Sequence, residues 1–250
     1  MSEWMKLEGR SRQVTIAGLV RNAQTGQGIA GVRVQITGMP AALQAKIDFL
    51  AQLYGEDWKQ RPDRTQTRPD GYFYFLDLPD GDYTLRADWL EAGTRYGSAE
   101  LPKVTVSRDS EDQINILAMG EVRCVIRCLY SSGEKHGNHG RSYLVEIPQN
   151  LYIDKGDTLP TIDLQPTSLT GIIRNENGKA LVMAKVQLEG SGEYTYSDRN
   201  GNYSMIGLEA SDKPRQVKVD ANGYQSQVAG IVLTKGQVRT LNMSLASVRQ

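Results

Sequence analysis

The sequence is poor in the residues that most often carry chemistry. It has only two cysteines and two histidines in 250 residues. Two cysteines are too few for a disulfide framework. A Ser-His-Asp triad needs a histidine as its base, yet His136 and His139 both lie in one polar, glycine-rich loop. No glycine-rich loop leads into a helix that could hold phosphate. We therefore expect a protein that is not an enzyme and has no cofactor.

The sequence also lacks net charge and long apolar runs. Its 29 basic and 29 acidic residues cancel, so no long-range field would gather nucleic acid or an anionic membrane. No run approaches the roughly 18 apolar residues of a membrane span. Residues 1–13 form a charged N-terminal arm without the apolar stretch of a secretion signal. We expect no nucleic-acid partner, no membrane insertion, and a cytoplasmic location, alone or in a particle assembled there.

What the sequence does contain is strands and turns. Residues 65–87 read as strand, turn, strand, turn, strand, with Pro69-Asp70-Gly71 and Asp80-Gly81-Asp82 supplying the two turns. Phe73 and Phe75 share one face of their strand at period two. Frequent glycine and many valine, isoleucine and threonine residues extend this pattern along the chain, which predicts an all-β protein. About seven strands over residues 14–118 predict a two-sheet sandwich.

Residues 40–60 break the strand pattern and predict a helix inserted in this first sandwich. Leu43, Ile47, Leu50 and Tyr54 recur at helical spacing. The helix either covers the open edge of its own sheet or lays its apolar stripe in a partner's groove. The partner-binding hypothesis takes its residues from the helical segment and from aromatic residues of a later loop: Leu43, Ile47, Leu50, Tyr54, Trp58, Trp89 and Tyr96.

Residues 119–166 form a middle β segment, which is a candidate abbreviated copy of the same module. A zinc site here would use two thiolates and two imidazoles, from Cys124, Cys128, His136 and His139. The cysteines, however, alternate along one face of a predicted strand and do not sit on a turn. Cysteine at such a position is usually a small core residue, so we predict no metal.

Residues 167–250 repeat the pattern of the first module without its helix. Gly18-Leu-Val-Arg-Asn returns as Gly171-Ile-Ile-Arg-Asn, and the Asp70-Gly71 turn returns as Asn200-Gly201. Residues 198–202 also suggest calcium ligands, but a calcium site needs a further bidentate acid that does not follow. The Asn-Gly pair favours a hairpin turn instead.

This pattern resembles the carboxypeptidase regulatory-like domain. The first copy carries it at Gly18, Gly31-Val32, Asp70-Gly71, Phe73, Phe75, Leu78-Pro79, Gly81, Tyr83 and Leu85, and the second at Gly171, Asn200-Gly201, Tyr203 and Leu208. The second copy departs from the pattern at residues 211–214. The resemblance implies tandem seven-stranded Greek-key β-sandwiches, transthyretin-like or immunoglobulin-like, with one inserted helix. It also implies an accessory module that usually carries no chemistry of its own. The zinc peptidase that names the family needs a His-x-x-Glu pair, which this sequence lacks, so we expect no such activity.

Two functional hypotheses follow. In the first, the chain is a structural or adapter subunit that joins other proteins in a larger assembly, such as a phage-tail-like or contractile injection particle. In the second, it binds a ligand or glycan through the loop aromatics Trp89, Tyr96 and Tyr194. The missing export signal favours the first hypothesis.

Overall fold

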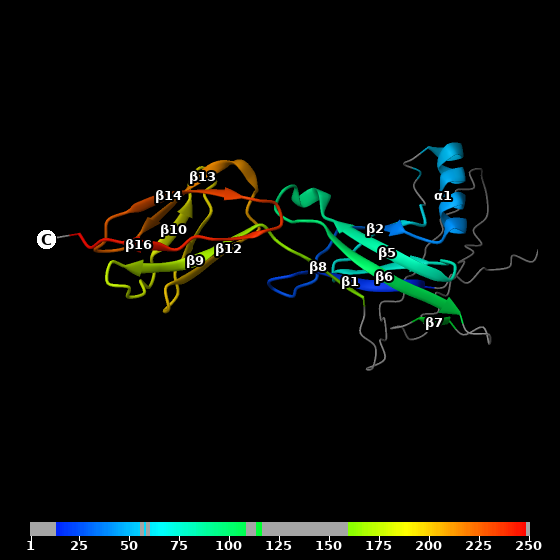
Figure 1. The fold of residues 1–250 in the computed structure, drawn as a ribbon, viewed down its shortest axis with the longest axis horizontal. Helices are drawn as coiled ribbons and strands as arrows, with labels where there is room; N and C mark the ends of the chain where they lie inside the picture. The colour runs from blue at the N-terminus through cyan, green and yellow to red at the C-terminus, as the bar shows by residue number, and fades with distance from the viewer. Residues whose placement is uncertain (1–13, 56–57, 59–60, 109–113, 117–159, 249–250) are drawn as a thin grey trace, which may run out of the picture.

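The computed structural model describes residues 14–55, 58, 61–108, 114–116 and 160–248, which form two β-sandwiches arranged end to end (Figure 1). The prediction of an all-β chain of tandem sandwiches is confirmed. The N-terminal arm and the candidate metal ligands Cys124, Cys128, His136 and His139 lie outside the described residues. No helix in the described part is long and apolar enough to cross a membrane.

The first sandwich consists of a three-stranded and a five-stranded sheet. In the smaller sheet, the central strand β1 is antiparallel to β4 and parallel to β8. The larger sheet has the order β3-β2-β5-β6-β7, and its neighbouring strands are antiparallel. The strands are β1 (Val14–Asn22), β2 (Arg33–Gly38), β3 (Arg64–Gln66), β4 (Tyr72–Leu76), β5 (Gly81–Asp88), β6 (Ala99–Arg108), β7 (Ile114–Ile116) and β8 (Thr161–Leu164).

The second sandwich repeats this plan. One sheet has the order β11-β10-β13-β14. In the other, β9 is antiparallel to β12, while β15 and β16 run parallel to β9 one after the other, as two halves of one edge. The strands are β9 (Ser168–Asn175), β10 (Lys185–Leu188), β11 (Tyr194–Tyr196), β12 (Asn202–Ile206), β13 (Ser211–Asp220), β14 (Gln227–Leu233), β15 (Val238–Thr240) and β16 (Met243–Leu245).

Besides the inserted helix, two differences separate the modules. The first has an additional strand, β7, beside β6, whereas nothing in the described part of the chain pairs with the corresponding side of β14. The first also takes its parallel strand β8 from residues 161–164, which the sequence analysis had placed in the middle segment. Ile162 and Leu164 are buried in the first core, so the first sandwich is completed only by residues at the end of that segment.

Each sandwich has its own hydrophobic core, filled by alternating residues of its strands. In the first, Phe73 and Phe75 on β4 are buried with their rings in an edge-to-face arrangement. Gly18 on β1 leaves room for the Phe73 ring, because a Cβ at Gly18 would lie 2.5 Å from Phe73 Cζ. The repeated glycine of the sequence pattern is therefore a packing requirement.

The helix α1 (Ala41–Tyr54) packs on the first sandwich through one side only. Leu43 and Ile47 are buried in the core of that module. The helix ends at Gly55, whose φ of 81° suits glycine and whose N–H donates to the Ala51 carbonyl. The prediction of a helical insertion is thus confirmed, over a shorter range than 40–60.

Buried Tyr203 on β12 leads to a pH prediction. Its hydroxyl donates to the Leu241 carbonyl at 2.7 Å, and burial raises the pKa of Tyr203. The pKa in the folded chain lies above the value of about 10 in the unfolded chain. The contribution of the neutral Tyr203 to the free energy of unfolding is therefore complete below about pH 10, and it is lost as the pH rises from there toward the raised pKa of the folded chain. Tyr203→Phe should therefore flatten the loss of unfolding free energy above about pH 10, at a cost of about 1 kcal/mol at neutral pH.

Urea unfolding at a series of pH values would measure this slope. The exposed Tyr194 provides the control, since Tyr194→Phe should leave the alkaline slope as in the wild type. Equal alkaline slopes for wild type and Tyr203→Phe would contradict the prediction.

Candidate functional site: the junction between the sandwiches

The two sandwiches meet at a junction whose linker is only residues 165–167, between β8 and β9. The linker is itself hydrogen-bonded to the first module. Gly97 N–H donates to the Gln165 carbonyl at 3.0 Å, and Tyr96 and Pro166 form a β-bridge. Because its backbone is held in this way, the linker is not a free hinge.

Thr167 ties the linker to both modules and is completely buried. Toward the first module, its N–H donates to the Arg95 carbonyl at 2.8 Å and its hydroxyl to the Thr94 carbonyl at 2.9 Å. Toward the second, its hydroxyl accepts from Gly236 N–H at 2.8 Å, and its carbonyl accepts from Leu208 N–H at 3.0 Å. The four hydrogen bonds of this one residue therefore join one loop of the first module to two loops of the second.

A second connection runs from the first module's β1–β2 turn to the start of β9. Gln24 Nε2 donates to Ser168 Oγ at 2.9 Å. The turn is held by Asn22, whose side-chain oxygen accepts from Gln24 N–H, while its Nδ2 donates to the Tyr96 hydroxyl at 2.9 Å. The turn, the linker and the loop before β6 thus form one network.

The loop before β6 and the turn between β14 and β15 touch backbone to backbone. Gly97 and Gly236 meet so closely that a Cβ on Gly236 would lie 2.5 Å from Gly97 Cα. Gly236 also has a φ of 66°, which side-chain-bearing residues avoid. Glycine at position 236 is therefore required both by conformation and by contact.

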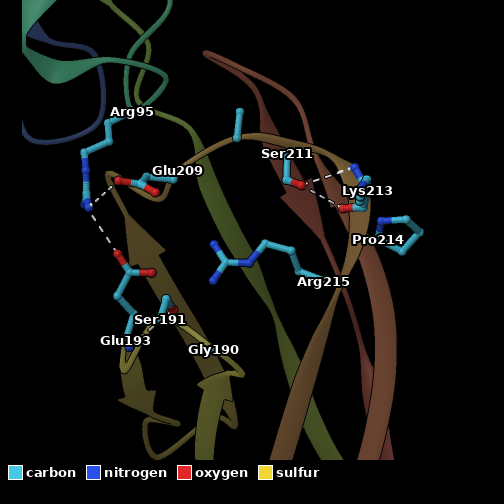
Figure 2. Close-up of a pocket in the computed structure, with 10 residues that line it drawn as sticks. Arg95, Gly190, Ser191, Glu193, Glu209, Ser211, Lys213, Pro214 and Arg215 are labelled. Carbon is cyan, nitrogen blue, oxygen red and sulfur yellow. Dashed lines mark hydrogen bonds and ion pairs between the residues drawn. The ribbon is translucent and has the colours of Figure 1, made fainter.

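Arg95 adds a hydrogen bond and two ion pairs across the junction, at the rim of a cleft of about 490 Å³ (Figure 2). Its guanidinium donates to the Gly207 carbonyl at 2.8 Å and makes ion pairs with Glu209 at 3.1 Å and Glu193 at 3.4 Å. The side chain is 43% exposed, and exposed ion pairs contribute only about 0.2–1 kcal/mol each. The four hydrogen bonds of the buried residue Thr167 therefore contribute more to the stability of the junction than these exposed ion pairs do.

The rest of the cleft is polar. Lys213 and Arg215 on β13 lie on its other side (Figure 2). No histidine or cysteine lines it, and the described residues include no group of three or more His, Cys, Asp or Glu side chains placed to hold a metal. The arrangement can join the modules and offer charged groups at the surface.

The predicted partner-binding residues of the helix divide between the core and the surface. Leu43 and Ile47 are buried in the first module and Leu50 is half-buried, so these three mainly anchor the helix. Tyr54 is exposed, and its ring lies 6.3 Å from that of half-buried Trp58. The exposed side of α1 carries two further apolar residues outside the predicted partner-binding set, Phe49 and Leu53.

The loop aromatics Trp89 and Tyr96 pack against each other, with ring centroids 4.9 Å apart, and against the first core. Tyr96 also contacts the linker directly through its β-bridge to Pro166. Tyr194, by contrast, is exposed and lies beneath the Lys185 ammonium. The residues that build the junction, Arg95, Gly97 and Thr167, carry no sequence motif. Sequence reasoning missed them, and the short stretch between Leu164 and Ser168 is the signal that could have indicated a tight junction.

The turn at residues 198–202 uses its acidic residue for the backbone. Asp198 Oδ1 accepts the N–H groups of Asn202 and Asn200, both at 2.8 Å, and these bonds lower the pKa of the carboxyl group. This geometry agrees with the predicted hairpin turn.

Comparisons with known proteins agree with this architecture. The model of the carboxypeptidase regulatory-like domain matches residues 15–118 and 168–246. A search of curated proteins finds no match. Solved structures with similarity to this chain include the shaft pilin SpaA (E269A mutant) of Lactobacillus rhamnosus GG, at 8% identity and a TM-score of 0.37, covering 96% of this chain and 98% of that one.

Two further solved structures are similar to this chain. The minor pilin GBS52 of Streptococcus agalactiae has 16% identity and a TM-score of 0.29, covering 90% of this chain and 86% of that one. A type II cohesin–X-dockerin complex of Acetivibrio cellulolyticus has 15% identity and a TM-score of 0.27, covering 32% of this chain and 56% of that one. Matched over well over half its length, with one copy in each of its two sandwiches, the chain belongs to the carboxypeptidase regulatory-like domain family.

Proposed function

We propose that this protein is a non-catalytic structural or adapter subunit of a larger protein assembly, such as a phage-tail-like or contractile injection particle assembled in the cytoplasm. The family and the fold fit a β-sandwich structural module. The observation that carries the proposal is the junction. A three-residue linker fastened on both sides gives two sandwiches a fixed relative position, as a spacer or adapter requires.

The exposed side of α1 is the surface proposed to contact another subunit. Phe49 and Leu53 are each 58% exposed and lie one helical turn apart, so their side chains are neighbours on the helix surface. Tyr54, at the end of the helix, is 67% exposed. The helix lies at the end of the molecule distant from the second sandwich (Figure 1). A partner bound there would leave the rest of the chain free to reach a second component.

The test is co-sedimentation of the tagged protein with large complexes in a lysate of its source cells. The wild type should sediment with a large complex. Phe49→Glu combined with Leu53→Glu should move most of the protein to the light fractions, because two carboxylates would be buried against an apolar partner. Their exposure predicts that the free fold is unaffected, which circular dichroism would check.

The matched control places the same charges on exposed apolar residues of the second sandwich, Val182 and Ile206. Val182→Glu combined with Ile206→Glu should leave sedimentation unchanged. A wild-type protein that sediments only as a free chain would refute the proposed role. Release by the control pair alone would locate the contact elsewhere and refute the helix surface.

A further inference from the structure

The outer edge of β14 in the second sandwich lacks the cover that its counterpart has in the first. In the first sandwich, β6 pairs with β5 on one side and with β7 on the other. In the second, β14 pairs with β13 on one side and ends its sheet within the described residues. The same chain therefore shows this edge once with an added antiparallel strand and once without one.

The two strands also differ in the features that limit strand pairing, and β7 pairs with β6 only at residues 106–108, beyond the stretch that carries these features. β6 contains Pro102 and Lys103, and Lys103 has a φ of 60° at a register shift relative to β5. Proline, lysine and bulges are the features by which sheet edges avoid adding strands. β14, with the sequence QVAGIVL, has no proline, no charge and no positive φ. An uncharged seven-residue edge strand is a favourable surface for adding another strand.

Side chains of β14 alternate between the core and the surface. Ile231 and Leu233 are buried, whereas Val228 and Val232 are 49% and 38% exposed. Both valines therefore lie on the outer face of the sheet, two residues to either side of Gly230. A Cβ at Gly230 would meet only ordinary contacts, the nearest at 3.9 Å. The outer face at the centre of the strand is therefore open.

We propose that the free edge of β14 pairs with β14 of a second copy of this chain, antiparallel about a two-fold axis at Gly230. In that register Val228 of each copy lies opposite Val232 of the other, and Ala229 lies opposite Ile231. Such a pairing matches apolar residues with apolar residues and sets no like charges against each other. It joins two four-stranded sheets into one continuous sheet and satisfies the unpaired backbone groups of both edges.

A second copy is the occupant that the sequence of the strand favours, because the apolar pattern of its five central residues, 228–232, is symmetric about Gly230. A two-fold contact between two identical strands requires this self-complementarity. Pairing with a strand of a different protein does not require it. The proposal goes beyond the adapter role, since it concerns the purified chain alone and does not depend on any larger assembly.

The first test is sedimentation equilibrium of the purified full chain over a wide range of concentration. The wild type should show a monomer–dimer equilibrium. Val228→Lys combined with Val232→Lys should weaken dimerisation at least tenfold, because like charges would oppose each other across the edge. Val182→Lys combined with Ile206→Lys is the matched control: it changes exposed apolar residues of the same sandwich, including one on β12 in the other sheet, and should dimerise as the wild type does.

The second test fixes the register. Gly230→Cys should give an oxidative dimer linked from position 230 to position 230, as peptide mapping by mass spectrometry would show. Val182→Cys should give no corresponding link. A wild-type chain that stays monomeric throughout, a dimer indifferent to the lysine pair on β14, or a Gly230→Cys chain without that link would each overturn the proposal.

Discussion

Gly171→Ala should destabilise the second sandwich by about 3 kcal/mol or more, which is at the upper end of the effects of overpacking. A Cβ at Gly171 would lie 1.9 Å from the Leu241 carbonyl oxygen and 2.8 Å from Tyr203 Cε1. The Leu241 segment cannot easily withdraw. Its N–H donates to the Thr170 carbonyl, and the neighbouring Asn242 side chain accepts from Ile172 N–H. Denaturant unfolding and calorimetry would measure the loss.

Gly230→Ala is the control for this substitution. Gly230 is also a strand glycine with an ordinary φ, but its Cβ would meet nothing closer than 3.9 Å. Since alanine restricts the unfolded chain more than glycine does, this change should be neutral or stabilising by up to about 1 kcal/mol. If the two variants unfolded at the same denaturant concentration, the close approach at Gly171 would not be what limits that position.

The repeat in the sequence was informative because it reflects this packing. Gly18 and Gly171 occupy the same place on the central strands β1 and β9. At both positions the backbone of the parallel edge segment approaches the glycine closely. A Cβ at Gly18 would lie 2.6 Å from the Pro160 carbonyl, and Leu19 N–H donates to the same oxygen. Local signals of this kind, together with turns and period-two alternation, were sufficient to predict both sandwiches.

Long-range features were not predictable in the same way. β8 pairs with β1 across more than a hundred residues of sequence, and four residues of alternating pattern give no indication of their partner. The helix was predicted from its spacing, but the periodicity did not tell which side is buried. The structure assigns Leu43 and Ile47 to the core and leaves Phe49 and Leu53 exposed.

The junction was the least predictable part, since its bonds are mostly made by backbone groups. Thr167 and Arg95 belong to no motif, and a threonine after a proline is an ordinary linker sequence. Its role comes from four hydrogen bonds to loops that are distant in the chain. Backbone hydrogen bonding of this kind depends on the folded position of every loop involved, so it cannot be predicted from composition or periodicity.

Gly236→Val should therefore release the second sandwich from its fixed position relative to the first. Its Cβ would lie 2.5 Å from Gly97 Cα and 2.8 Å from Gly97 N, at a φ of 66°. The turn between β14 and β15 must then move away, which breaks the bond from Gly236 N–H to Thr167 Oγ1. We expect small-angle X-ray scattering to show a broader distribution of distances between the modules, with both sandwiches still folded.

Gly223→Val separates backbone strain from contact. Gly223 has a φ of 82°, but no atom lies within 4 Å of its Cβ position. Each variant should lose about 1–3 kcal/mol through the strained backbone, yet only Gly236→Val should alter the scattering profile. If the Gly236→Val profile coincided with that of the wild type, the Gly97–Gly236 contact would not be what fixes the two sandwiches. The rigid spacing on which the adapter role depends would then have to come from the other junction contacts, those of Thr167, Gln24 and Arg95.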